Sequence, residues 1–183
     1  MCSKGSILFL SIRSVFMRLC FIFLFLMQDR GFSQATRNNH DISAICSYIH
    51  EILKFVEWHG SSRNTPCVGV TGSVELAREV VRESDGWFTV RILSDTSDIR
   101  QCDALLFLGD SLDTGILHAL RKRPILTIGT NDSFCESGGI IEIVEAKNDD
   151  LRFEINLTRI EESGLIVDPY FIHLADTIHR EAD

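Results

Sequence analysis

Three short segments of the chain contain the residue types that nucleophilic acyl transfer requires. Ser111 follows a run of apolar residues and opens a predicted helix, so its hydroxyl could act as a nucleophile. Asn131 follows the next apolar run, where its side-chain amide could donate a hydrogen bond to an oxyanion. Asp176 and His179, near the C-terminus, could supply an orienting acid and a base. Together these four residues define a hypothetical hydrolytic site.

The same residues also have an interpretation without catalysis. The blocks Gly109–Leu112, Gly129–Asp132 and Asp176–His179 look like those of GDSL-type esterases. In that family the serine follows the first strand of the domain, whereas Ser111 follows the third predicted strand. The pattern is explained equally simply if Asp110 or Ser111 is a helix N-cap and the second block forms a tight turn. We therefore predict that the protein is not an enzyme and keep the esterase as an alternative.

Other sequence features argue against a cofactor. Gly69–Ser73 joins a predicted strand to a predicted helix, but it lacks the GxGxxG pattern and a nearby lysine, so a tight turn is favoured over a phosphate site. The six histidines show no metal-ligand spacing, and there is no CxxC pair. The chain has 18 Lys+Arg against 26 Asp+Glu, a net charge of −8, which does not suit nucleic acid. We expect no cofactor, metal or nucleic acid; a module that binds a small ligand stays a further alternative.

The N-terminus has the features of a signal peptide. Residues 1–35 hold four basic residues and one acid, and Leu19–Met27 is a run of nine apolar residues. That run is too short to span a membrane, which takes about 20 residues, but it suits the core of a signal peptide. Ser33-Gln34-Ala35 supplies a cleavage site, with translation starting at Met1 or Met17. The alternative is an uncleaved anchor. Cleavage would leave 148 residues with 14 basic and 25 acidic side chains, an acidic exported protein.

Four cysteines remain after the predicted cleavage, and in an oxidising compartment they allow three complete pairings. Cys67 opens the first predicted strand, and Cys102 comes just before the strand at 104–108. Parallel neighbours would bring these two strand starts together, so Cys67–Cys102 is the disulfide that the geometry favours. Closing this loop could contribute about 3–4 kcal/mol to stability. Cys46 lies on the core face of a helix and is expected to be a packed thiol.

Alternating apolar strands and helices indicate the fold class. Helices are expected over 42–56, 73–83, 110–120 and 169–180, and strands over 66–71, 87–93, 104–108, 124–128, 139–145 and 151–157. Strands that alternate with helices pair in parallel and are covered on both faces. The last two strands flank a polar turn and form an antiparallel hairpin. We predict a single α/β domain over 36–183, with a Rossmann-like, mostly parallel sheet, helices on both faces and a C-terminal antiparallel hairpin.

Three segments together resemble one family. They are Tyr48–Trp58, Gln101–Leu108 and Phe134–Leu157, and the last contains the most specific motifs, Gly138–Ile141 and Arg152–Leu157. They resemble the YfiR/HmsC-like periplasmic proteins, and the resemblance covers essentially the whole chain after the signal peptide. It implies an exported α/β domain, often a homodimer and without a cofactor, that represses an inner-membrane diguanylate cyclase by protein contact. An outer-membrane lipoprotein can sequester such a repressor, which raises cyclic-di-GMP and biofilm formation.

Two positions depart from the family pattern. The proline that usually follows the helix-ending tryptophan is His59 here. The best-studied member has a second disulfide across the glycine-rich turn, and its partner position here corresponds to Glu142, which leaves Cys135 unpaired. The resemblance therefore implies the fold but not the redox behaviour.

The C-terminal segment is the candidate partner-binding surface. It combines apolar and aromatic residues with polar neighbours: Leu165, Ile166, Asp168, Tyr170, Phe171 and His173. These residues could equally cap the sheet. The family resemblance favours an exposed patch that docks a partner or a second subunit, because aromatic anchors with a polar rim are usual at interfaces.

Overall fold

The protein is described here from a computed structural model, which describes residues 42–58, 65–72, 74–93, 96–109, 112–145 and 150–180. All of these residues belong to one compact unit, Asn39–Asp183. The predicted signal peptide at 1–35 lies outside the described residues, as do Ser73, Asp110 and Ser111. None of the described helices is long and apolar enough to cross a membrane.

Strands and helices alternate through the first two thirds of the described chain. The helical elements are α2 (Ile42–Leu53), α3 (Val74–Glu83), the 3-10 helix η1 (Thr96–Gln101), α4 (Thr114–Leu120), α5 (Leu157–Ser163) and α6 (Pro169–His173). The strands are β1 (Val56–Glu57), β2 (Cys67–Thr71), β3 (Thr89–Ile92), β4 (Ala104–Phe107), β5 (Leu126–Gly129), β6 (Ile141–Glu145), β7 (Leu151–Asn156), β8 (Ile166–Val167) and β9 (Thr177–His179).

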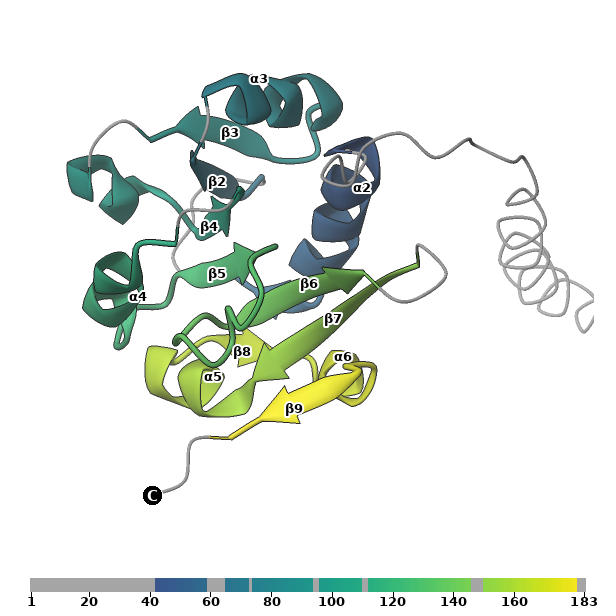
Figure 1. Ribbon diagram of the computed structural model, residues 1–183, viewed down its shortest axis with the longest axis vertical. Helices are drawn as coiled ribbons and strands as arrows, with labels where there is room; N and C mark the ends of the chain where they lie inside the picture. Colours follow the sequence, from purple (N-terminus) through teal and green to yellow (C-terminus); the bar gives the residue numbers. More distant parts are fainter. Residues whose placement is uncertain are drawn as a thin grey trace, which may run out of the picture. The chain divides into compact units, whose positions relative to one another are not determined.

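Seven strands form one sheet in the order β3-β2-β4-β5-β6-β7-β9 (Figure 1). The five strands from β3 to β6 pair in parallel, and β6 and β7 form the expected antiparallel hairpin. Every residue of β4 and β5 is buried, because parallel strands in the middle of such a sheet are covered on both faces. This architecture confirms the predicted fold class.

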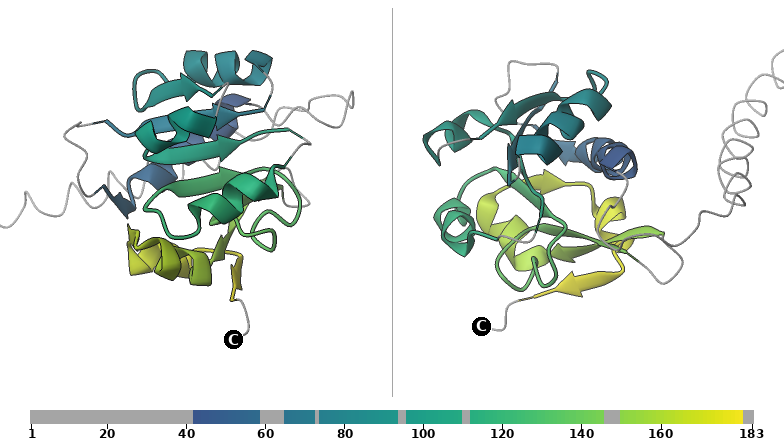
Figure 2. Two further views of the ribbon diagram at one scale, coloured as in Figure 1. Left: turned by 90° about the vertical axis from the view of Figure 1, so that its left-hand side faces the viewer. Right: turned by 45° about the horizontal axis from the view of Figure 1, so that its top comes forward.

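The core has two parts, one on each face of the sheet. On one face α2 inserts Ile45, Ile49 and Ile52 into the larger apolar cluster. On the other face η1 and α4 cover the smaller cluster, which contains Leu117 and Phe134. Figure 2 shows the sheet between α4 on one side and α2 on the other. The helical spacing of apolar residues therefore predicts α2 from the sequence, but the helix ends at Leu53, and Val56, expected at its end, belongs to β1.

The C-terminal end differs from the prediction. The helix expected over 169–180 ends at His173, and β9 follows it and pairs in parallel with β7. The backbone amide of Asp176 donates to the carbonyl of Phe153, which turns the chain toward the sheet edge. In addition, α5 follows β7 directly, with the side chain of Asn156 capping its first turn. The sequence pattern does not reveal these two elements because α5 has only 7 residues and β9 only 3.

Two smaller expectations are also corrected. The helix predicted from Asp110 begins at Thr114, and the Asp113 side chain accepts hydrogen bonds from the amides of Gly115 and Ile116 as its N-cap. In the strand predicted over 87–93, the alternation of Phe88, Val90 and Ile92 places Ile92 on the core face, but Ile92 is 40% exposed. The strand that contains it, β3, is an edge strand of the sheet, where part of the apolar face has no cover.

Candidate functional site

Exposed apolar side chains lie between residues 166 and 174. Tyr170 is 64% exposed, Leu174 50% and Ile166 48%. Asp168 and His173 are exposed beside them, and the Asp168 carboxylate accepts a hydrogen bond from the backbone amide of Tyr170 as the N-cap of α6. We call these five residues the C-terminal surface. Four of them were predicted from the sequence as partner-binding residues.

The other two predicted partner-binding residues, Leu165 and Phe171, lie in the core. Phe171 is 3% exposed and its ring stacks between those of Phe55 and Phe153, with centroid distances of 5.1 and 4.5 Å. The expectation that these two residues are exposed is therefore wrong. The short helix α6 turns one apolar residue inward and leaves Tyr170 outside, so adjacent aromatic residues have opposite environments.

A small ribbon fixes the C-terminal surface to the end of α2. β8 pairs antiparallel with β1, and Val56 lies opposite Val167. The backbone amide of Asp168 donates to the carbonyl of Phe55 at 2.9 Å. Two segments more than 100 residues apart in sequence thus hold the surface in place.

The structure brings Cys67 and Cys102 together. The backbone amide of Cys67 donates to the Asp103 carboxylate, and the Asp103 amide donates to the Cys67 carbonyl, both at 2.8 Å. Both thiols are buried on the face of the sheet that η1 and α4 cover. Burial, and then the neighbouring Cys67 thiol, raise the pKa of Cys102 to about 12. The four cysteines of the described residues are all free thiols in this structure, so the disulfide stays a prediction.

The glycine-containing turn between β5 and β6 is closely packed. Phe134 is fully buried, and a Cβ atom at Gly129 or Gly139 would lie within 2.4 Å of its ring. Only glycine fits at these two positions, because a contact under 3.0 Å requires the ring to move. The turn therefore keeps a fixed shape against the sheet.

A buried carboxylate holds this turn. Glu142 is 6% exposed, and its two carboxylate oxygens accept hydrogen bonds from the backbone amides of Ser133 and Cys135 at 3.1 and 3.0 Å. Burial raises the pKa of Glu142 despite these hydrogen bonds. The Cys135 thiol donates to the carbonyls of Ile140 and Glu154, and burial raises its pKa as well. The sequence does not reveal this role of Glu142. The alternation of residues along a strand does not show which parts of the chain cover a given side chain.

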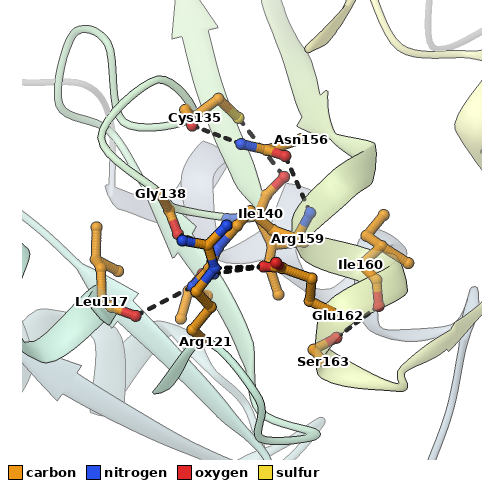
Figure 3. Close-up of polar contacts among 11 residues, drawn as sticks. Leu117, Arg121, Cys135, Gly138, Ile140, Asn156, Arg159, Ile160, Glu162 and Ser163 are labelled. Atoms are coloured by element: carbon orange, nitrogen blue, oxygen red, sulfur yellow. Dashed lines mark hydrogen bonds and ion pairs between the residues drawn. The ribbon is translucent and has the colours of Figure 1, made fainter. Parts of the chain in front are cut away.

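Arg159 connects the same turn to two helices (Figure 3). It is 5% exposed, and its Nε donates to the carbonyl of Gly138 at 3.0 Å and its Nη2 to the carbonyl of Leu117 at 3.1 Å. Its Nη1 donates to Glu162 at 2.8 Å, and the Arg121 Nε reaches the same oxygen at 2.7 Å. The hydrogen bond from Arg121 is the main reason that the pKa of Glu162 is lowered. No sequence pattern indicated this buried arginine.

The hypothetical hydrolytic site does not assemble among the described residues. Asp176 accepts a hydrogen bond from Arg152 at 2.8 Å, and His179 contacts Glu154 at 2.5 Å, so the proposed acid and base have other partners. The amide of Asn131 donates to the carbonyl of Gly109. Ser111 lies outside the described residues. Within the described ranges no group of three His, Cys, Asp or Glu side chains could hold a metal ion.

The order of the strands assigns the domain to a known fold class. Counted along the chain, the parallel strands have the order 2-1-3-4-5 of doubly wound, flavodoxin-like domains. A conserved domain protein from Vibrio cholerae O1 biovar El Tor strain N16961 superimposes with a TM-score of 0.52 at 14% identity, over 76% of this chain and 60% of that one. The ABC domain in complex with L-Trp from Streptococcus pneumonia gives 0.51 at 13% identity, over 71% and 59%. At these identities the likeness shows the fold alone.

The family model described as YfiR/HmsC-like matches residues 44–176, and the chain belongs to this family. At the level of the family, membership indicates a periplasmic regulator of cyclic-di-GMP signalling. This chain spans about three fifths of the two similar structures. None of the curated proteins matches it.

Proposed function

We propose that this protein is a non-enzymatic periplasmic regulator that represses an inner-membrane diguanylate cyclase by direct contact. The observation that carries the proposal is the family match over residues 44–176. Repression would lower cyclic-di-GMP and, with it, biofilm formation. Asp176 pairs with Arg152 and His179 pairs with Glu154, so each of these two residues of the esterase alternative has a different partner.

The C-terminal surface is the proposed contact with the cyclase. Tyr170 and Leu174 offer apolar area, and the charged Asp168 and the polar His173 lie beside them. This combination resembles the anatomy of protein interfaces, where aromatic anchors are surrounded by a polar rim. Leu165 and Phe171 support the surface from the core and would act on binding only through the fold.

The proposal also requires that the protein is exported to the periplasm. Removal of residues 1–35 would deliver the acidic domain to the periplasm, where the sensor domain of a membrane cyclase is accessible. An outer-membrane lipoprotein that binds the regulator would release the cyclase. We further expect a homodimer, in line with the resemblance, and no role for a cofactor or nucleic acid.

The decisive experiment compares two charge substitutions of exposed apolar residues. Tyr170→Glu changes the C-terminal surface, and Val81→Glu is the matched control on α3, which lies near the opposite edge of the sheet (Figure 1). Each variant is expressed in cells that lack the native gene, and cellular cyclic-di-GMP is measured together with the melting temperature of the purified protein. We expect Tyr170→Glu to raise cyclic-di-GMP to the level of the gene deletion, and Val81→Glu to keep it low.

Two results would reject parts of this proposal. Unchanged cyclic-di-GMP after deletion of the whole gene would reject repression itself. If deletion raises cyclic-di-GMP but Tyr170→Glu, folded normally, still complements it, the contact lies on another surface.

A further inference from the structure

A groove of about 400 Å³ lies between η1 and α4, over the smaller apolar cluster. Its apolar wall is formed by Ile99 of η1 and by Ile116, Ala119 and Leu120 of α4. Ile116 is half-buried and Ala119 is exposed, so part of this wall has no cover. The volume falls within the range of small-molecule sites, and the wall suits a ligand with a hydrocarbon body.

Two arginines line the groove at one of its ends. Arg100 belongs to η1, and Arg123 follows α4. Arg100 comes four residues before Ala104 and Arg123 three before Leu126, and Ala104 pairs with Leu126 at the starts of β4 and β5. Within the described part of the chain, neither guanidinium has an ion pair or a side-chain hydrogen bond. Two cations without partners beside apolar surface favour a negatively charged group at this end.

The acidic residue that lines the groove, Asp113, lies at the other end. Asp113 precedes α4, whose 7 residues span about 10 Å, whereas Arg123 follows this helix. The carboxylate of Asp113 accepts hydrogen bonds from the backbone amides of Gly115 and Ile116 at 2.9 and 3.3 Å. An anionic group is therefore repelled from this end and attracted to the end with the two arginines. The charges give a bound anion one preferred orientation.

We propose that the groove between η1 and α4 binds a small carboxylic acid with an apolar body. The carboxylate lies beside Arg100 and Arg123, since it matches the planar donor groups of arginine. The apolar body lies along Ile116 and Ala119 and removes this wall from water. Both parts of the ligand are needed. The site lies on different elements from the C-terminal surface and does not depend on the proposed regulatory function.

The test compares octanoate, below its micelle concentration, with 1-octanol, which has the chain without the charge, and acetate, which has the charge without the chain. NMR titration of the mature chain follows binding through the amide signals of Ile116 and Ala119. Arg123→Gln removes one cationic partner. Lys122→Gln is the matched control, because it removes the same charge from an exposed neighbour that does not line the groove. Ala119→Glu adds a carboxylate to the exposed part of the wall, and the melting temperature of each variant checks its fold.

We expect octanoate to shift the amide signals of Ile116 and Ala119 saturably, 1-octanol to bind more weakly, and acetate not to saturate at the same concentrations. Arg123→Gln should lower the affinity for octanoate about threefold to tenfold, because the lost ion pair is partly exposed to solvent. Lys122→Gln should keep the affinity, and Ala119→Glu should lower it at least about tenfold through repulsion of like charges. Absence of octanoate binding, equal affinity for octanoate and 1-octanol, equal losses in Arg123→Gln and Lys122→Gln, or shifts confined to residues outside the groove would each overturn the proposal.

Discussion

The Glu142 carboxylate accepts a hydrogen bond from the backbone amide of Cys135 at 3.0 Å, across the turn that leads into β6. Its other oxygen accepts from the amide of Ser133 at 3.1 Å. The family resemblance places a second disulfide of its best-studied member at the positions of Cys135 and Glu142. In this chain two hydrogen bonds to a buried carboxylate connect the same two positions, so the turn is held by a group that titrates.

Stability should therefore depend on pH through Glu142. Burial raises the pKa of this carboxyl above its usual value, with Glu154 acting in the same direction and His179 against it. Because the folded chain then binds the proton more tightly than the unfolded chain, stability falls as the pH rises from the ordinary value of 4.5 to the raised one. The melting temperature of Glu142→Gln should lose this part of the pH dependence. Glu161→Gln, at an exposed position of α5, should keep it.

Oxidation should join Cys67 to Cys102. The two thiols lie together at the starts of β2 and β4, and a bond there would close a loop of about 35 residues, with a contribution of about 3–4 kcal/mol. Peptide mapping of periplasmic protein without reductant should find the pair linked. Cys67→Ser should then lower the free energy of unfolding by about 2–4 kcal/mol under oxidising conditions. With reductant present, the difference should shrink. Free labelling of both thiols in unfolded, unreduced protein would disprove the bond.

The sequence predicts the parallel half of the fold well because the signals there are long or uniform. The helix α2 has twelve residues with apolar spacing, and β4 and β5 consist of residues that are all buried. The region after β7 depends on tertiary contacts instead. β9 has three residues, and its pairing with β7 determines that it is a strand and not the end of a helix.

The candidate sites also divide into features that the sequence predicts and features that depend on tertiary contacts. Adjacent placement of Cys67 and Cys102 follows from parallel pairing, which the sequence predicts. The burial of Phe171 beside the exposed Tyr170 requires the position of Phe55, which comes from the start of the chain. In the sequence Arg159 lies after the last predicted strand and outside any predicted helix, and only the packing of α4 against the turn and α5 encloses it.

Phe171 and Tyr170 should respond in opposite ways to truncation. Phe171→Ala removes a buried ring that contacts two other rings, so it should cost about 3–5 kcal/mol of stability. Tyr170→Ala removes a ring that is 64% exposed and should change stability by less than about 0.5 kcal/mol. Urea denaturation of both variants measures this difference. Equal stability losses would show that the two side chains share one environment.

Processing of the N-terminus should begin the mature chain at Thr36. The apolar run Leu19–Met27 and the small residues Ser33 and Ala35 motivate this prediction. Mass spectrometry of protein from the periplasmic fraction should give a chain of residues 36–183. Ala35→Arg should block cleavage and leave the precursor at the membrane, whereas Ala44→Arg, beyond the cleavage site, should be processed normally. Full-length protein in the cytoplasm would contradict export.

Arg159 should matter far more for stability than Arg121, although both donate to Glu162. Arg159→Ala leaves the carbonyls of Gly138 and Leu117 without their donor and opens space in the core, so it should cost about 2–4 kcal/mol. Arg121→Ala removes a half-exposed partner and should cost no more than about 1 kcal/mol. Denaturation of the two single variants and the double variant gives their coupling. A larger loss for Arg121→Ala would contradict the role of Arg159 as the residue that holds α4, the turn and α5 together.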